Sequence, residues 1–196
     1  MSATVLIVTD VFGNTPAIAS LQRHLCLPCD IVSPFAEGYS ATTEQTAYQA
    51  FLASGGVQTY AKKIESIIQQ NPFYRHVIGF SAGASAWWLA NTFSATKIDS
   101  VTLFYGSRIR DHVDHNSSQQ ARGNTHLIFA EKENAYQPQQ VVKALHQRGY
   151  HAEIASGTKH GFMNPYAAGF SLKAQTHYME LLVQKLHDHP ALAFGT

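Results

Sequence analysis

Ser81 stands in the stretch Gly79-Phe80-Ser81-Ala82-Gly83, which matches the pattern G-x-S-x-G. An apolar run of strand length ends at Phe80, and residues that suit a helix begin at Ala82. A sharp turn between a strand and a helix lifts a serine hydroxyl to the carboxyl edge of a sheet, beside the positive end of the helix dipole. The pattern and its context therefore predict Ser81 as a nucleophile.

A serine hydroxyl needs a base to remove its proton, and in chains with this motif the base comes last, after an acid. His160 follows the last strand-like run. A loop from the carboxyl edge of the sheet can lower its imidazole onto Ser81. We therefore expect His160 to be the general base.

The acid that orients the imidazole is expected after the fifth strand-like run, which ends near Ala130. Glu131 and Glu133 both lie there. We favour Glu133, because a carboxylate directly at a strand end is often committed to the edge of the sheet, whereas one two residues further on can reach the histidine.

Two backbone amides should hold the negative oxygen that forms during attack. One belongs to Ala82, directly after the nucleophile, and Val11 in the loop after the first strand is our choice for the other. Asp10 beside this loop is unusual. It is expected to bond the resting serine, to tune the loop or to cap the turn, and the sequence leaves these three roles open.

The elements that must position these residues alternate along the chain. Six strand-like runs are expected at 5–8, 31–32, 77–80, 101–105, 126–130 and 152–155, and helical patterns at 16–25, 42–70 with a break at 54–56, 82–91, 138–147 and 171–187. Continuous apolar strands that alternate with helices are typical of a parallel sheet. We predict an α/β fold with a doubly wound, mostly parallel sheet of about six strands, helices on both faces, and a single domain over residues 1–196.

Four segments resemble the dienelactone hydrolase family of α/β-hydrolases. They are Thr9-Asp10-Val11-Phe12-Gly13, Gly79-Phe80-Ser81-Ala82-Gly83, Tyr105-Gly106, and His160-Gly161-Phe162 with Asn164-Pro165, in the order of that family. The resemblance implies a triad of Ser81, an acid after the fifth strand, and His160, with an oxyanion hole at Val11 and Ala82. It also implies a sheet reduced to about six strands, because the chain starts at what would be the family's third strand.

This chain departs from the family's namesake at several positions. Ser81 stands where the namesake has cysteine, Glu133 where the acid is usually aspartate, and Asp10 where the namesake has glutamate. No arginine closely follows His160, so the namesake's clamp for a substrate carboxylate is not evident. Serine at this position suits general esters.

The expected activity is hydrolysis of a small carboxylic ester or lactone through an acyl-enzyme on Ser81, without a cofactor. The expected substrate pocket contains Asp10, Phe12, Phe35, Tyr105 and Phe162. The sequence does not separate an esterase from a lactonase, and a peptidase remains open. Two alternatives are a non-catalytic small-molecule-binding module on the same fold and a thiol redox protein that uses Cys26 and Cys29. The second is disfavoured because a helical pattern precedes the cysteines and a strand follows them, the reverse of a redox motif.

Composition limits the partners. The 196 residues carry a formal net charge of +1 and no cluster of lysine and arginine, which disfavours nucleic acid as a partner. The N-terminus does not look like a signal peptide, and no apolar stretch approaches the roughly 20 residues that span a bilayer. We expect a cytoplasmic monomer or homodimer that binds a small molecule. Residues 111–115 resemble a metal-ligand cluster, but a solvated loop is favoured and no metal site is predicted.

Overall fold

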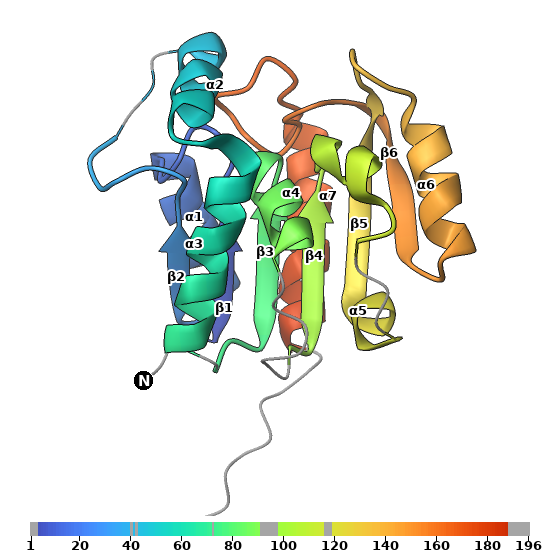
Figure 1. The fold of residues 1–196 in the computed structure, drawn as a ribbon, viewed down its shortest axis with the longest axis horizontal. Coiled ribbons are helices and arrows are strands. Elements are labelled where there is room, and N and C mark those ends of the chain that lie inside the picture. The colour runs from blue at the N-terminus through green and yellow to red at the C-terminus, as the bar shows by residue number, and fades with distance from the viewer. Residues whose placement is uncertain are drawn as a thin grey trace, which may run out of the picture.

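Six parallel strands form one sheet at the centre of the fold (Figure 1). The computed structural model describes residues 4–39, 41, 43–71, 73–90, 98–115 and 119–187. The order across the sheet is β2-β1-β3-β4-β5-β6. The strands are β1 (Val5–Val8), β2 (Cys29–Val32), β3 (His76–Phe80), β4 (Ser100–Phe104), β5 (Thr125–Lys132) and β6 (His151–Lys159). The predicted fold class is confirmed, and the sheet is parallel at every pairing.

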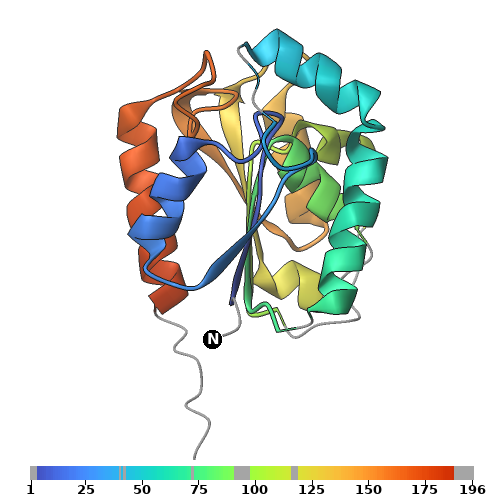
Figure 2. The ribbon, with the colours of Figure 1, turned by 90° about the vertical axis from the view of Figure 1, so that its left-hand side faces the viewer.

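Helices cover the sheet on both faces (Figure 2). On one side lie α1 (Pro16–Leu25) and α7 (Leu172–His187), and on the other α3 (Gly56–Gln70), α4 (Ala82–Leu89) and α6 (Pro138–Gln147). We call these the α1/α7 face and the α4 face. The helix α2 (Glu44–Ala53) packs on α3, while η1 (Ser107–His112) and α5 (Gln119–Asn124) connect β4 to β5.

Alternation along the strands divides the core between the two faces. In β1, Leu6 and Val8 pack with the α4 face, whereas Val5 and Ile7 pack with the α1/α7 face. All four side chains are fully buried. A parallel strand that is covered on both sides must be apolar along its whole length, which is why the strands were visible in the sequence as continuous runs.

Most predicted boundaries agree with the structure. The helices 16–25 and 138–147 are confirmed, and Gly55 separates α2 from α3 where a break was expected. The predicted residues Thr42 and Asn91 lie outside the described residues. The largest difference is β6, which continues to Lys159 instead of ending near residue 155. This extension carries the chain to the carboxyl edge of the sheet immediately before His160.

The chain reverses its direction of winding at β1, which has β2 on one side and β3 on the other. Ligands of such sheets bind outside the carboxyl ends of the strands near this switch point. Asp10, Ser81, Tyr105, Glu133 and His160 each follow the end of a strand by one or two residues. The topology therefore gathers the predicted site residues at one edge.

Candidate active site

Ser81 occupies a strained turn between β3 and α4. Its φ is +48°, in the left-handed region that residues other than glycine rarely adopt. The Ser81 amide donates to the Phe104 carbonyl at 2.9 Å, which ties the turn to β4. A Cβ atom at Gly83 would lie 2.4 Å from the carbonyl oxygens of Val8 and Thr9, so only glycine lets α4 approach β1 this closely.

Three of the predicted residues form a hydrogen-bonded series. The Ser81 Oγ lies 2.8 Å from His160 Nε2, and His160 Nδ1 lies 2.8 Å from Glu133 Oε1. An ionised Glu133 accepts a hydrogen bond from Nδ1–H, which leaves Nε2 free to accept the serine proton. This is the arrangement that general-base activation of a serine requires.

Glu133 and Glu131 have different partners, which separates the two candidate acids. The Glu133 side chain is only 6% exposed and contacts His160. Glu131 instead accepts hydrogen bonds from the Gly157 amide at 2.6 Å and the Ser156 hydroxyl at 3.0 Å. These bonds, led by the one from Gly157, lower the pKa of Glu131. Glu131 therefore holds the β5–β6 edge and takes no part in the triad geometry.

The loop that carries His160 is anchored to α7. The Ser171 amide donates to the Phe162 carbonyl at 3.1 Å, and Gln175 Nε2 donates to the Met163 carbonyl at 3.0 Å. The edge of Tyr105 packs against the His160 ring, with the ring centroids 5.1 Å apart. Tyr105 also has a positive φ, +40°, at the end of β4. These contacts restrict the imidazole to the orientation that faces Ser81.

The two backbone amides predicted for the oxyanion hole belong to Ala82, directly after Ser81, and to Val11, in the loop after β1. Ala82 is the first residue of α4, so its amide is one of those that have no partner inside the helix. Val11 follows Asp10 in the loop after β1, and within the described part of the chain its amide donates to no other residue. Both groups are available as donors to a bound ligand.

Asp10 braces the loop after β1. Its Oδ1 accepts from the Phe12 amide at 2.9 Å and its Oδ2 from Asn164 Nδ2 at 2.6 Å. Burial raises the pKa of the Asp10 carboxyl, although these two hydrogen bonds oppose the shift. Among the contacts of the described residues, none joins Asp10 to Ser81. Of the roles left open by the sequence, tuning and capping of the loop agree with these contacts. The Asn164 partner was missed, because only the resemblance had pointed to that segment.

The predicted pocket residues occupy different surroundings. Phe162 is fully buried and packs against Tyr105 in the core of the α1/α7 face, so it lies behind the site and not in a pocket. Phe12 packs near Tyr166, and Phe35 stacks on Tyr39 with centroids 3.8 Å apart. Asp10 and Tyr105 line a hollow between α1 and α7.

The two cysteines do not have the surroundings of a redox pair. Cys26 and Cys29 are free thiols at the end of α1 and the start of β2. Burial, together with the neighbouring charge of Asp30, raises the pKa of Cys29 to about 11. A reactive thiol needs the opposite shift.

The acidic residues of the 111–115 run form ion pairs: Asp111 pairs with Arg108 at 3.0 Å, and Asp114 pairs with Arg148.

One group of potential metal ligands occurs among the described residues, on β5 and β6. It consists of His126, His151 and Glu153. The two imidazoles stack with centroids 4.1 Å apart and planes 13° from parallel, so their lone pairs do not converge on one point. Burial lowers the pKa of His151, and the charges of His126 and Lys185 lower it further. This group is a poor fit to a resident cation.

Searches against known proteins place this geometry in context. No protein-family profile matches the chain. The Bacillus subtilis protein YczH is 28% identical over 176 residues, which cover 85% of this chain and 84% of that protein. No helix in the described ranges is both long and apolar enough to cross a membrane.

Several solved structures with related architecture carry the names of hydrolases. A Klebsiella pneumoniae protein proposed to be a dienelactone hydrolase has a TM-score of 0.65 at 15% identity, over 93% of this chain and 86% of its own. The dienelactone hydrolase of Anabaena variabilis has a TM-score of 0.57 at 14% identity, over 93% of this chain and 84% of its own. The Bacillus cereus carboxylesterase has a TM-score of 0.52 at 11% identity, over 92% of this chain and 87% of its own. At these identities the likeness establishes the fold, and the chain has an α/β-hydrolase fold of the kind found in dienelactone hydrolases.

Proposed function

We propose that the protein is a serine hydrolase of the dienelactone hydrolase type that cleaves a small carboxylic ester or lactone. The observation that carries this proposal is the series from Ser81 Oγ to His160 Nε2 and from His160 Nδ1 to Glu133, with 2.8 Å at each step. Support also comes from the positive φ of Ser81, a conformation that costs energy and recurs at active sites.

In the proposed reaction, the Ser81 oxygen attacks the carbonyl carbon while His160 Nε2 takes the hydroxyl proton. Negative charge develops on the carbonyl oxygen, where the Val11 and Ala82 amides donate to it. His160 then gives the proton to the departing alkoxide, which leaves an alcohol and an acyl group on Ser81. Water then attacks the acyl group while His160 takes a proton from it. The bond to Ser81 breaks, the carboxylic acid leaves, and the Ser81 oxygen regains its proton from His160.

Glu133 acts in this scheme through the imidazole. Its carboxylate fixes the tautomer in which Nε2 is the acceptor, and it stabilises the imidazolium that forms during each proton transfer. Tyr136 lies close by, and its pKa is raised by burial and then by the charge of Glu133. A hydrogen bond to Glu133 raises this pKa further, so Tyr136 stays neutral and its hydroxyl is a second donor to the Glu133 carboxylate.

A fluorophosphonate probe and a series of p-nitrophenyl esters of increasing acyl length test the proposal together. We expect the probe to label the wild type, and Ser81→Ala to abolish labelling and reduce kcat by about five to six orders of magnitude. Absence of labelling in the folded wild type would favour a non-catalytic binding module. Ester hydrolysis that persists in Ser81→Ala would contradict the mechanism.

Glu133→Gln and Glu131→Gln form a matched pair for the acid. Both remove one carboxylate charge near the carboxyl end of β5, but only Glu133 contacts His160. We expect Glu133→Gln to lower kcat by about 10³–10⁴-fold, because an amide supports the wrong tautomer. Glu131→Gln should stay within about threefold of the wild type, since it changes only the β5–β6 edge. Equal losses in both variants would remove Glu133 from the triad.

A further inference from the structure

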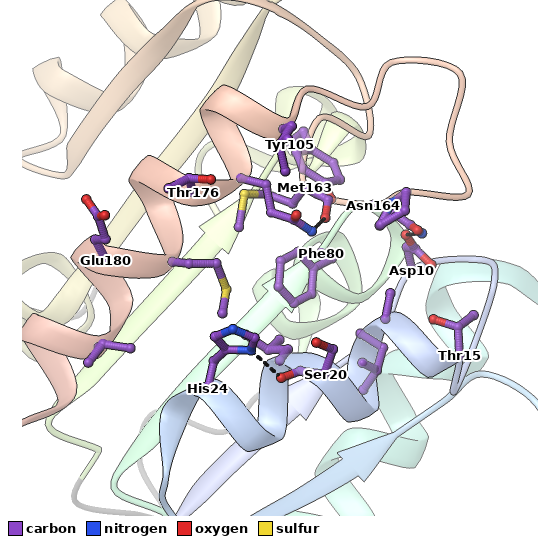
Figure 3. Close-up of a pocket in the computed structure, with 18 of the residues that line it drawn as sticks. Asp10, Thr15, Ser20, His24, Phe80, Tyr105, Met163, Asn164, Thr176 and Glu180 are labelled. Atoms are coloured by element: carbon purple, nitrogen blue, oxygen red, sulfur yellow. Dashed lines mark hydrogen bonds between the residues drawn. The ribbon is translucent and has the colours of Figure 1, made fainter.

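A hollow of about 720 Å³ lies between α1 and α7, on the face of the sheet opposite α4 (Figure 3). We call it the α1/α7 groove. Its volume is within the range of small-molecule sites. Ser81, Glu133 and His160 are not among its lining residues, but Asp10 and Tyr105 are, so the groove borders the proposed catalytic centre without including its three reacting side chains. Nothing in the proposed ester hydrolysis accounts for it.

The walls of the α1/α7 groove are mainly apolar in surface, although Ser20, Thr176 and Gln184 also line them. Ile18 and Leu21 of α1 line it, as do Met179 and Val183 of α7. Phe80 forms part of the floor, as Figure 3 shows. Packing in protein interiors normally leaves few voids larger than a water molecule. A hollow of this size with such walls has the properties of a place for a hydrocarbon chain.

The groove is polar at its inner end, beneath the loop that carries His160. Asp10 and Asn164 line that end and are joined by a hydrogen bond of 2.6 Å. Tyr105 lies there too, with its side chain fully buried, and the Met163 backbone is the hydrogen-bond partner of its hydroxyl. A hydroxyl oxygen can take part in more than one hydrogen bond, so Tyr105 adds polar character to this end. The inner end is thus equipped to receive one polar group.

The polar side chains at the inner end of the α1/α7 groove determine which kind of ligand group fits there. Asp10 offers carboxylate oxygens, while Asn164 and Tyr105 offer donors that can also accept. A hydroxyl group is both a donor and an acceptor on one atom, so it suits this mixed set. A carboxylate only accepts, and it would bring a second negative charge to Asp10, with Glu180 already on the rim. A charged ammonium would have to be desolvated inside apolar walls.

We infer that the α1/α7 groove binds a neutral, chain-shaped molecule that ends in a hydroxyl group, independently of turnover at Ser81. The chain lies between the apolar sides of α1 and α7, and the hydroxyl meets Asp10 at the inner end. His24 and Glu180 stand at the outer rim, where the far end of the chain meets water.

Decanol binding to the full-length Ser81→Ala protein tests the inference without any chemical step. Displacement of the neutral dye N-phenyl-1-naphthylamine reports the dissociation constant. Decanol should bind at least about tenfold more tightly than decanoate or decylammonium, and more tightly than 1-methoxydecane, which cannot donate. Decanoate or decylammonium binding as well as decanol would overturn the head-group assignment. Because Ser81 is absent, failure here would leave the proposed hydrolase untouched.

Val183→Trp and Lys173→Trp locate the site on α7. Val183 lines the groove, whereas Lys173 is exposed and does not. The indole at 183 should weaken decanol binding by about tenfold or more, because it takes the space of the chain, and the indole at 173 should not. Ala17→Phe fills the groove from α1 and should act like Val183→Trp, which guards against a folding defect of either variant. Equal binding in all three would overturn the inference. So would light scattering that shows a wild-type dimer separated by Val183→Trp, since the groove would then be an interface between two copies.

Discussion

The α4 face fills its space with large side chains, whereas α1 and α7 leave a hollow of about 720 Å³ against the same sheet. Trp87 and Trp88 are both fully buried on the α4 face. Trp88 packs on Tyr150 with ring centroids 5.0 Å apart, and its indole N–H donates to the His112 carbonyl at 2.7 Å. The α4 face is thus filled throughout, whereas the α1/α7 face combines a packed aromatic core around Phe104 and Phe162 with an open groove beside it. We call them the dense layer and the loose layer.

This difference in packing agrees with what the proposed catalytic site and the proposed binding groove each require. Ser81 begins the helix of the dense layer, and its carbonyl accepts from both the amide and the hydroxyl of Ser85 at 2.9 and 3.0 Å. A strained turn persists only when its surroundings over-determine it, and dense packing supplies that support. A site that admits a flexible chain needs adaptable walls instead, and two methionines, Met163 and Met179, line the groove.

Trp87→Ala and Met179→Ala should separate the two layers most strongly. We expect Trp87→Ala to lower the free energy of unfolding by about 3–5 kcal/mol, because it leaves a large cavity in a filled core. Met179→Ala should cost about 1 kcal/mol, since its half-buried side chain borders a hollow and has less contact to lose. Urea unfolding at pH 7 measures both. Similar costs would mean that the two layers are equally well packed.

Local pattern predicted the strands of the sheet and the turn that carries Ser81. Continuous apolar runs revealed the strands, and the spacing in Gly79-Phe80-Ser81-Ala82-Gly83 predicted the turn, because Gly83 must pass two carbonyl oxygens at close range. Glu133 was preferred over Glu131 because it lies further beyond an expected strand end near Ala130. The structure extends β5 to Lys132, so Glu131 lies in the strand and Glu133 directly follows it, with its carboxylate next to His160.

The loose layer could not be predicted in the same way. A void depends on how far α1 and α7 stand from the sheet, and no run of residues encodes that distance. The bond between Asp10 and Asn164 joins residues 154 positions apart. Phe162 was expected in the pocket because it is close to His160 in sequence, but the chain turns at Gly161 and sends the ring into the core.

Substitutions that enlarge a side chain should also distinguish the two layers, with a somewhat smaller effect on the free energy of unfolding. Ala84 is fully buried in the α4 face, within reach of Gly79 and Gly106, whereas Ala17 lines the α1/α7 groove. Ala84→Leu should cost about 1–3 kcal/mol through overpacking. Ala17→Leu should change stability by less than about 0.5 kcal/mol or increase it, because the leucine fills existing space. Thermal unfolding of both variants decides the matter, and destabilisation by Ala17→Leu equal to that of Ala84→Leu would count against an open groove.

Asp10 lies where the two layers meet, and its titration gives the subtlest test. Burial raises the pKa of its carboxyl in the folded state above the ordinary value of 3.8. The folded protein therefore holds this proton more tightly than the unfolded chain, so ionisation of Asp10 costs stability as pH rises from about 4 through the raised pKa. Asp10→Asn removes that cost. The free energy of unfolding of the variant, relative to the wild type, should rise with pH over this window and then stay constant.

Urea unfolding at a series of pH values from 4 to 8 measures this difference, with Glu37→Gln as the control. Glu37 is exposed, so its variant should follow the wild type at every pH. Two other charges affect Asp10: that of His160 lowers its pKa and that of Glu44 raises it. The Asp10→Asn series is therefore repeated in a His160→Ala background, where the same slope is expected to remain. A slope of the opposite sign would show that the bonds from Asn164 and Phe12 outweigh burial.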